Sequence, residues 1–393
     1  MLSYRARATS IIPDQYIVVF GKNLTDNQIS DHYDDVDNML SNDEDNLKTR
    51  TADSPTYGIN NKYKIGSFQG YSGTFSKSCI DKIKQRSDVA YVEQNQKVYA
   101  SEIQANAQPN LVRISHKNVT GQTTYEFDPI AGKDVNIYII DTGILVSHSE
   151  FGGRARVGVT VPDAEDTDKA GHGSHVAATA AGNKFGVAKK SNLIAVKVLG
   201  DDGSGSNTDV ITGVQFALDD HKKNLENSQK TGKPFKGSVA NLSLGGGKSA
   251  AVDAAVNSAV DGGMVVVVAA GNDDVDACTQ SPSGASKVIS VAAIDGKDTR
   301  ADFSNFGKCV KMFAPGVNIL SAGIKSNTDT AILSGTSMAS PHVAGLAAYF
   351  LSLSDTPLTT QELSDKIFSV AIPGVVKDVK GSPNVLAFND NQD

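Results

Sequence analysis

Long apolar runs are missing from this sequence of 393 residues. The longest, residues 264–270, is far shorter than the roughly eighteen residues that a membrane-spanning helix needs, so we expect no membrane partner. Residues 1–16 contain two arginines but lack the apolar stretch of a signal peptide. We therefore expect either that a targeting segment precedes this sequence or that the protein is not exported.

Surplus positive charge is also missing. Lys and Arg number 37 against 44 Asp and Glu, and the resulting net charge of −7 argues against a nucleic-acid partner. With 39% hydrophobic residues, 21% charged residues and 36 glycines, the composition is that of a globular protein and not of a disordered or fibrous one. The length allows a large core and more than one domain.

Cysteine is scarce, and its count leaves the redox state open. The three cysteines are Cys79, Cys278 and Cys309. The count alone is equally consistent with Cys278 and Cys309 being reduced and buried or being joined to one another. Cys79 is expected to be a core residue of its helix.

Residues 1–101 indicate a small separate domain. The expected elements, in order, are the strand Tyr16–Phe20, the helix Leu24–Leu40, strands at Tyr63–Ile65 and Gly70–Phe75, the helix Lys77–Arg86 and the strand Val89–Val92. This βαββαβ order predicts a ferredoxin-like α+β fold. The polar segments Ser41–Pro55 and Ala100–Pro109 are expected to be a solvated loop and an exposed linker that a protease can reach.

Beyond the linker, apolar strands alternate with helical stretches. The expected strands are Val135–Ile140, Leu193–Leu199, Val239–Leu244, Met264–Ala270 and Val288–Ala292, and the expected helices are His172–Ala181, Asp209–Leu225 and Ala250–Asp261. Strands that are apolar throughout and separated by helices predict a parallel sheet covered on both faces. Functional side chains are then expected at the carboxyl ends of the strands.

A serine and an aspartate stand at positions suited to chemistry. Ser337 opens the buried helical stretch Leu333–Phe350, where its hydroxyl could attack a substrate and its unpaired backbone N–H could bind an oxyanion. A lone serine there is more often a helix N-cap. Asp141 follows the apolar strand VNIYII, although a single aspartate is more often a turn residue.

A histidine completes the set of candidates. His172 lies in the segment GHGSHVAATAAG, between two glycines and before a helix of small residues. His172 and His175 are spaced like a pair of metal ligands, but the surrounding sequence does not complete a zinc ligand set. We therefore predict no metal at these histidines.

The blocks around these residues resemble a known family. IIDTG at Asp141, GHGSHVA at His172 and SGTSMASPHVAG at Ser337 resemble the subtilisin-like serine peptidases, most closely their fungal proteinase K and cerevisin branch. The blocks occur in that family's order of Asp, His and Ser, and the resemblance covers most of residues 110–390, including AAGND and FSNFG. It implies a three-layer, doubly wound, mostly parallel α/β fold and a serine endopeptidase of broad specificity.

The resemblance assigns a role to each candidate. Ser337 would attack the peptide carbonyl, His172 would carry its proton, and Asp141 would orient the imidazole. Asn272, in the AAGND block, would donate its side-chain amide to the oxyanion beside the Ser337 N–H. In isolation, Asn272 would be taken for a turn residue.

Substrate would bind as an added strand, gripped through its backbone. By resemblance, the gripping segments are Gly203, Ser204 and Gly205, and Ser243, Leu244 and Gly245. Neither Gly-rich segment completes a phosphate-binding loop. The P1 pocket would be formed by Ser243–Gly245 together with Ala269, Ala270, Gly271 and Asn272. Such a pocket is open and uncharged, which predicts a preference for apolar or aromatic side chains.

The first domain resembles the inhibitor-type, I9-like propeptide of the same family, through IPDQYIVVF, YSGTFS and DVAYVEQNQKV. We expect residues 1–101 to assist folding and then to inhibit the peptidase domain, residues 102–393. The chain would then be a zymogen, with its own propeptide as a partner besides protein and peptide substrates. Self-cleavage is expected between Tyr99 and Ala105, near Ser101, and the product is expected to be a monomer.

Two positions bear on ions and on the compartment. Lys311 stands where the strong calcium site of this branch has an Asp, so we predict that this site is empty and that no cofactor is needed, while weaker calcium sites stay open. Cys278 and Cys309 match a disulfide of some relatives, which implies an oxidising compartment and hence a secreted or vacuolar enzyme.

Sequons for N-glycosylation start at Asn23, Asn118 and Asn241. Asn241 is expected on a buried strand and therefore unmodified, and the other two would be used only on a secretory route.

Two alternatives to an active peptidase stay open at this point. The chain could be a catalytically silent protein of the same fold that has a structural or binding role, or its first domain could act chiefly as a free inhibitor of other proteases. The four catalytic positions hold competent residues, which favours the enzyme.

Overall fold

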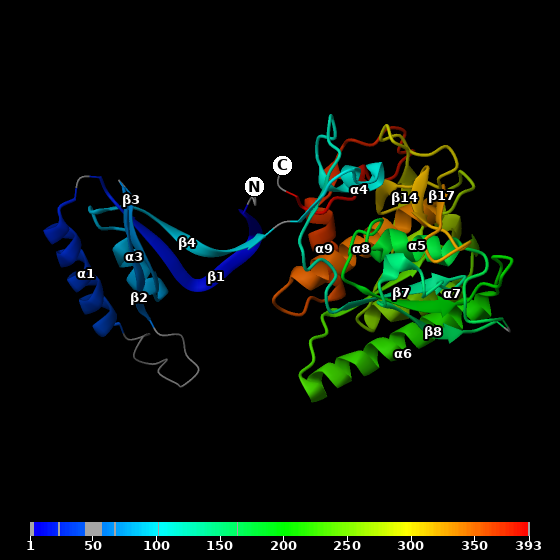
Figure 1. Ribbon diagram of the computed structural model, residues 1–393, viewed down its shortest axis with the longest axis horizontal. Coiled ribbons are helices and arrows are strands. Elements are labelled where there is room, and N and C mark those ends of the chain that lie inside the picture. Colours follow the sequence, from blue (N-terminus) through cyan, green and yellow to red (C-terminus); the bar gives the residue numbers. More distant parts are fainter. Residues whose placement is uncertain are drawn as a thin grey trace. The chain divides into compact units, whose positions relative to one another are not determined.

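The computed structural model describes residues 4–22, 24–43, 57–66, 68–100, 102–162 and 164–391. The chain divides into two compact units, Met1–Ser101 and Glu102–Asp393 (Figure 1). Three expectations lie outside the described residues: the sequon at Asn23, residues 44–55 of the expected loop, and the cleavage position near Ser101.

The first unit is built on a four-stranded antiparallel sheet with the order β2-β3-β1-β4. Its elements are β1 Tyr4–Phe20, α1 Asp26–Ser41, β2 Gly58–Ile65, β3 Phe68–Thr74, α3 Lys77–Ile83 and β4 Val89–Ala100. The predicted βαββαβ order is confirmed. Both helices begin at polar caps, since the hydroxyls of Thr25 and Ser76 accept from backbone N–H groups of the first turns.

The outer parts of β1 and β4 form a ribbon that the sequence did not predict. Both strands extend beyond the expected residues, to Tyr4 and Ala100, which lie opposite each other. Pro13 does not end β1, because it falls where the register with β4 shifts, between Ile11 and Tyr16. The pairing of the two strands, and not the local composition, decides their length.

The core of the first unit lies between its sheet and its helices. It consists of Val18, Phe20, Val36, Leu40, Tyr71, Phe75, Cys79, Ile80 and Ile83. Cys79 is a buried free thiol on α3, so its predicted place in the core is confirmed. This unit therefore has a hydrophobic core of its own.

The second unit is built around a nine-stranded sheet with the order β18-β19-β15-β14-β12-β10-β7-β9-β8. The strands are β7 Val135–Asp141, β8 Ala155–Thr160, β9 Asn192–Lys197, β10 Gly237–Leu242, β12 Val265–Ala269, β14 Ile289–Ile294, β15 Met312–Pro315, β18 Ile372–Pro373 and β19 Val385–Leu386. Neighbours are parallel, except that β18 runs antiparallel to β19. The predicted mostly parallel sheet is confirmed.

Helices cover both faces of this sheet (Figure 1). They are α4 Pro109–Ser115, α5 His172–Ala181, α6 Asn207–Thr231, α7 Ala250–Asp261, α8 Thr336–Leu353 and α9 Thr360–Val370. Along β7, Ile137 and Ile139 pack with α5 and α8, whereas Tyr138 and Ile140 pack with α6 and α7. Strands buried on both faces explain the uninterrupted apolar runs. Among the helices in the described ranges, none is long and apolar enough to cross a bilayer.

The helix boundaries follow local chemistry. Ser206 caps the start of α6, which continues to Thr231, beyond the predicted end. It stops there because Gly232, with a φ of 69°, adopts the left-handed conformation that closes a helix. At α5, Gly171 has a φ of 87° and turns the chain directly into the helix, so that His172 is the first helical residue.

The expected linker is in part a strand. β5, Glu102–Gln104, pairs with β6, Tyr125–Phe127, and the side-chain amide of Gln104 donates to the carbonyl of Lys184 at 3.1 Å. The expectation of an exposed linker over Ala100–Pro109 did not include this strand, although Glu102 and Ile103 of β5 are exposed as expected. The local sequence could not reveal this, because the strand partner lies elsewhere in the chain.

Candidate active site

The predicted functional residues lie at one edge of the sheet and at two helix starts. Asp141 is the last residue of β7, and Asn272 follows the end of β12. His172 opens α5, and Ser337 is the second residue of α8. Because β7 and β12 flank β10 in the parallel sheet, their carboxyl ends meet at the same edge.

Asp141 and His172 form a hydrogen-bonded pair. Asp141 is wholly buried, and its Oδ1 accepts from His172 Nδ1 at 2.8 Å and from the backbone N–H of Thr142 at 2.7 Å. Burial lowers the pKa of His172, but the charge and hydrogen bond of Asp141, with a further contribution from Asp168, raise it above the ordinary value. A proton held on Nδ1 leaves Nε2 as an acceptor, so the pair can work as a general base.

Asp168 forms hydrogen bonds with the segments that carry Asp141 and His172. Its buried carboxylate accepts hydrogen bonds, at 2.7–3.1 Å, from the Thr142 hydroxyl, the N–H groups of Ala170 and Gly171, and the N–H and hydroxyl of Ser174. These donors are sequence neighbours of Asp141 and His172, so Asp168 fixes the two segments relative to one another. Sequence reasoning missed it, and its place just ahead of the GHGSHVA block was the available signal.

Ser337 is tied to the end of β10. Pro341, one turn later in α8, has no N–H, so the carbonyl of Ser337 lacks its helical partner. Ser243 takes this place, since its hydroxyl donates to the Ser337 carbonyl at 2.8 Å. In return the Ser337 hydroxyl donates to the Ser243 carbonyl at 3.2 Å. The reciprocal bonds hold the Ser337 hydroxyl at the carboxyl edge of the sheet.

Asn272 is held by Thr336. Its Oδ1 accepts from the N–H of Thr336 at 2.8 Å and from the Thr336 hydroxyl at 2.9 Å. A Cβ added to Gly335 would lie 3.5 Å from Asn272 Nδ2 and 3.6 Å from the backbone nitrogen of Ser337, so both nitrogens border the same space. Two N–H donors around one space can bind an oxyanion. Sequence reasoning missed Thr336, although it directly precedes Ser337.

A cavity of about 500 Å³ lies beside these groups. Its lining consists of Thr142, His172, Leu199, Gly203, Ser204, Gly205, Ser206, Asn207, Val210, Ser243, Leu244, Gly245, Gly246, Val252, Ser281 and Pro282. Both segments that were expected to grip the substrate are therefore in it. Among these lining residues, His172 is the one titratable side chain, and the rest are small, polar or apolar.

Of the residues predicted to form the P1 pocket, Ala269, Ala270, Gly271 and Asn272 are not among the described residues that line this cavity, and neither is Ser337. Ala269 ends β12, and the carbonyl of Ala270 accepts the side-chain amide of Asn305 at 2.9 Å. A wall of the cavity comes instead from Ser281 and Pro282. Ser281 belongs to β13, Gln280–Ser281, which pairs with β11, Gly246–Gly247, and the local sequence gives no sign of this pairing.

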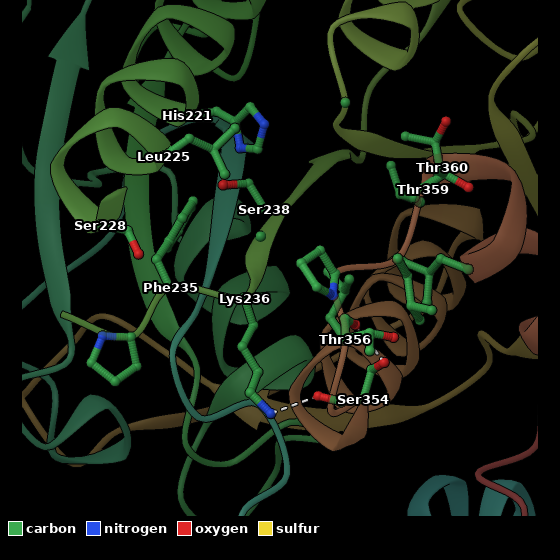
Figure 2. A pocket seen from close by; sticks show the side chains of 18 of the residues that line it. His221, Leu225, Ser228, Phe235, Lys236, Ser238, Ser354, Thr356, Thr359 and Thr360 are labelled. Atoms are coloured by element: carbon green, nitrogen blue, oxygen red, sulfur yellow. Dashed lines mark hydrogen bonds between the residues drawn. The ribbon is translucent and has the colours of Figure 1, made fainter. Parts of the chain in front are cut away.

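A second cavity, of about 520 Å³, lies at the opposite edge, where β10 and β12 begin (Figure 2). His221 and Leu225 of α6 line one side, and Thr360 of α9 lines another. Burial lowers the pKa of His221 to about 4, so this imidazole is neutral. The amine of Lys236 already donates to the Ser354 carbonyl at 2.8 Å. None of the predicted catalytic residues is among the described residues of this lining.

The remaining predicted positions can be placed individually. Cys278 and Cys309 are joined by a disulfide. Lys311 donates its backbone N–H to the Ser290 carbonyl at 2.8 Å, next to β15.

Two of the predicted sequons lie in the described residues. Asn241 is wholly buried on β10, as predicted, whereas Asn118 is exposed. In the part of the chain that the structure describes, no group of three or more His, Cys, Asp or Glu side chains could hold a metal ion.

Known proteins resemble this chain along nearly its whole length. Alkaline protease 2 of Aspergillus fumigatus is 44% identical over 403 residues, which cover 96% of this chain and 81% of that protein. Subtilisin-like protease 2 of Pseudogymnoascus destructans is 45% identical, and the match covers 98% of this chain and 91% of that protein. Cerevisin of Saccharomyces cerevisiae is 43% identical, and the match spans 97% of this chain and 64% of cerevisin.

Family profiles and a solved structure agree with these relatives. The crystal structure of a cold adapted subtilisin-like serine proteinase matches 72% of this chain and 99% of its own, with a TM-score of 0.66 and 39% identity. The profile of the peptidase inhibitor I9 family matches residues 15–101, and that of the subtilase family, peptidase S8, matches residues 132–388. The chain therefore belongs to the subtilase family of serine peptidases and carries an inhibitor I9 domain ahead of its peptidase domain.

Proposed function

We propose that Asp141, His172 and Ser337 form the catalytic triad of a self-processing serine endopeptidase of broad specificity. The observation that carries the proposal is the 2.8 Å bond between Asp141 and His172, at a cavity whose wall residue Ser243 is bonded in both directions to Ser337. A buried carboxylate, an imidazole and a hydroxyl at a helix start are the groups that acyl transfer needs.

Acylation follows from these positions. Ser337 Oγ attacks the carbonyl carbon of the substrate, and His172 Nε2 takes the hydroxyl proton while Asp141 stabilises the imidazolium. The carbonyl oxygen becomes an oxyanion, which receives hydrogen bonds from Asn272 Nδ2 and the Ser337 N–H. The C–N bond then breaks, His172 gives its proton to the leaving amine, and the acyl group stays on Ser337.

Deacylation repeats the steps with water as the nucleophile. His172 takes a proton from water as the oxygen attacks the acyl carbon, and the same two donors stabilise the second oxyanion. The bond to Ser337 breaks, the serine regains its proton from His172, and the carboxylic acid product leaves. We propose that the chemistry needs no cofactor.

The cavity supports the expected substrate binding. Gly203–Gly205 and Ser243–Gly245 offer backbone groups to an extended peptide, which binds as an added strand whatever its side chains are. Leu199, Val210 and Leu244 supply apolar surface to the lining, which has no acidic or basic side chain among its described residues besides His172. A preference for apolar or aromatic P1 side chains follows from this lining.

We infer that residues 1–101 assist folding and then inhibit the peptidase domain, residues 102–393. The first unit has its own core, and β5 already pairs with β6 of the second unit. Cleavage just before β5, near Ser101, would therefore separate two units without breaking either sheet. The product would be a monomer that acts on protein and peptide substrates.

The disulfide indicates the compartment of the enzyme, and Lys311 bears on calcium binding. A disulfide between Cys278 and Cys309 persists only under oxidising conditions, so we propose that the enzyme is secreted or vacuolar. Lys311 brings a positive charge to the place of the family's strong calcium site, and we propose that this site is empty.

The test compares wild type with Ser337→Ala. Wild type is expected to be purified as a shorter chain that reacts with a fluorophosphonate probe, whereas Ser337→Ala stays at full length and is not labelled, because no activated hydroxyl remains. Intact mass and N-terminal sequencing give the readout.

Ser334→Ala is the matched control, because Ser334 is an exposed serine in the same segment, and it is expected to process like wild type. A wild type that is not labelled would support a catalytically silent protein. A fully active enzyme with an intact Met1 would contradict self-processing.

A further inference from the structure

The turn that carries Asn272 lies outside the sheet. It runs from Ala270 to Val275 after the end of β12, and Asn272 itself is exposed. Thr336 engages the side-chain oxygen of Asn272. The direction of the amide also depends on the backbone on which the side chain stands, and an exposed turn needs that backbone to be held from elsewhere.

Asn305 holds this backbone on both sides of Asn272. It lies in the FSNFG segment and is wholly buried. Its partners on the turn are, before Asn272, the carbonyls of Ala270 and Gly271, each at 2.9 Å, and, after Asn272, the N–H groups of Asp273 at 3.0 Å and Val275 at 3.1 Å. The side-chain amide makes three of these bonds, and the backbone N–H of Asn305 makes the bond to Gly271. Outside the turn, Asn305 Nδ2 also donates to Gln280 Oε1 at 2.8 Å.

An amide side chain suits this position because it both donates and accepts. An aspartate could not donate to the Ala270 carbonyl, and an alanine would leave buried polar groups without partners. Gly271 provides the room, since a Cβ there would lie 2.2 Å from Asn305 Nδ2. Its φ of 104° is also one that glycine adopts without strain. The turn and Asn305 are therefore matched to each other.

We propose that Asn305 is a positioning residue for catalysis: by holding the backbone before and after Asn272, it aims the Asn272 amide at the space beside the Ser337 N–H. The inference rests on the oxyanion role proposed above for Asn272. A donor that is already aimed needs no reorientation when the oxyanion forms. Asn305 is buried behind the turn and is not among the described residues of the cavity lining.

The test is a double-mutant cycle in the full chain. The kcat for a peptide p-nitroanilide is measured per active site, with the sites titrated by a fluorophosphonate so that only folded molecules count. Asn305→Ala is expected to lower kcat about 10-fold and to change KM less than about 2-fold, a part of the 10²- to 10³-fold that loss of the oxyanion amide costs in subtilisin. In an Asn272→Ala background, the same substitution is expected to change kcat less than about 2-fold, because no amide is left to aim.

Asn389→Ala is the matched control. Asn389 is also a buried asparagine, but its side-chain amide donates to the Glu126 carbonyl at 2.7 Å, on β6. Its loss is expected to lower Tm and to leave kcat unchanged. Asn305→Ser keeps a hydroxyl that can accept one of the N–H bonds, and it is expected to give an intermediate kcat. It replaces Asn305→Ala if that variant does not accumulate as folded protein.

The outcomes separate this inference from the proposed function. An unchanged kcat in Asn305→Ala, or equal losses in both backgrounds, would overturn the inference and leave Asn305 with a purely structural role. An unchanged kcat in Asn272→Ala alone would instead refute the oxyanion role of Asn272.

Discussion

At the scale of single residues, the site depends on buried carboxylates whose hydrogen bonds come from precise neighbours. Asp141 and Asp168 are both inaccessible to solvent or nearly so, and each would be costly to bury without donors. Backbone N–H groups around Gly171 and the hydroxyls of Thr142 and Ser174 supply those donors to Asp168. The Asp168 carboxylate, whose charge raises the pKa of His172, is therefore held in place by the segments that carry Asp141 and His172.

Asp168→Asn is expected to move the acid limb of the pH profile of kcat/KM to lower pH, by up to about one unit. In the proposed mechanism only neutral His172 can take the serine proton, so activity is expected to rise with pH through the pKa of His172. Asp168 raises that pKa, and removal of its charge lowers it. The profile is measured on a peptide substrate at saturating and limiting concentrations.

Asp166→Asn makes the same change of charge on the same loop at an exposed residue, and it should leave the limb nearly in place. A lower kcat for Asp168→Asn without any displacement of the limb would show that Asp168 only supports the fold.

At the scale of elements, bounds that local residues set could be predicted, whereas bounds that distant partners set could not. The predicted bounds of α5 and α7 match the structure, because glycines at positions 171, 182 and 262 and the cap at Ser249 mark their ends locally. The lengths of β1 and β4 and the existence of β5 depend on partners far away in the chain. Periodicity within one segment does not contain that information.

The disulfide belongs to this scale, because it joins the loop after Asn272 to the segment after Asn305. Replacing both Cys278 and Cys309 by serine is expected to lower the free energy of unfolding by roughly 3 to 4 kcal/mol, since the bridge closes a loop of 31 residues in the unfolded chain. Urea unfolding in a Ser337→Ala background, which prevents self-digestion, measures the change.

Cys79→Ser is the control, because it removes a free thiol of the first unit and no bridge. Detection of three free thiols in the denatured, unreduced protein would mean that the bridge does not form.

At the scale of the whole molecule, the chain consists of two units that have separate cores and match different families. The first unit carries the inhibitor I9 match, and the second carries the peptidase S8 match. The second unit joins its halves through one continuous sheet, so the site is assembled from strands and helices that span most of its length. Unfolding of the second unit would therefore disassemble the site. Whether calcium stabilises this unit can be tested.

Removal of calcium by a chelator is expected to change the Tm of Ser337→Ala protein by less than about 2 °C, which for a chain of this size corresponds to less than about 2 kcal/mol. This expectation rests on the proposal that the ammonium of Lys311 takes the place of the cation at the family's strong site. Scanning calorimetry with and without calcium measures the shift. Lys311→Asp is the companion variant and should acquire a Tm that rises with calcium, whereas a drop of many degrees in the parent on chelation would contradict the proposal.

The sequence by itself determined the βαββαβ order of the first unit, the buried parallel strands of the second and the candidate site residues, because apolar periodicity, glycine caps and short motifs are local properties. Only the tertiary structure decided which residues support the reactive ones. Thr336, Asp168 and Asn305 bond to segments remote from their own or across a turn, and Ser281 and Pro282 line the cavity where Ala269–Gly271 were expected. Hydrogen bonds and strand pairings between distant segments set these relations, and they exist only once the chain has folded.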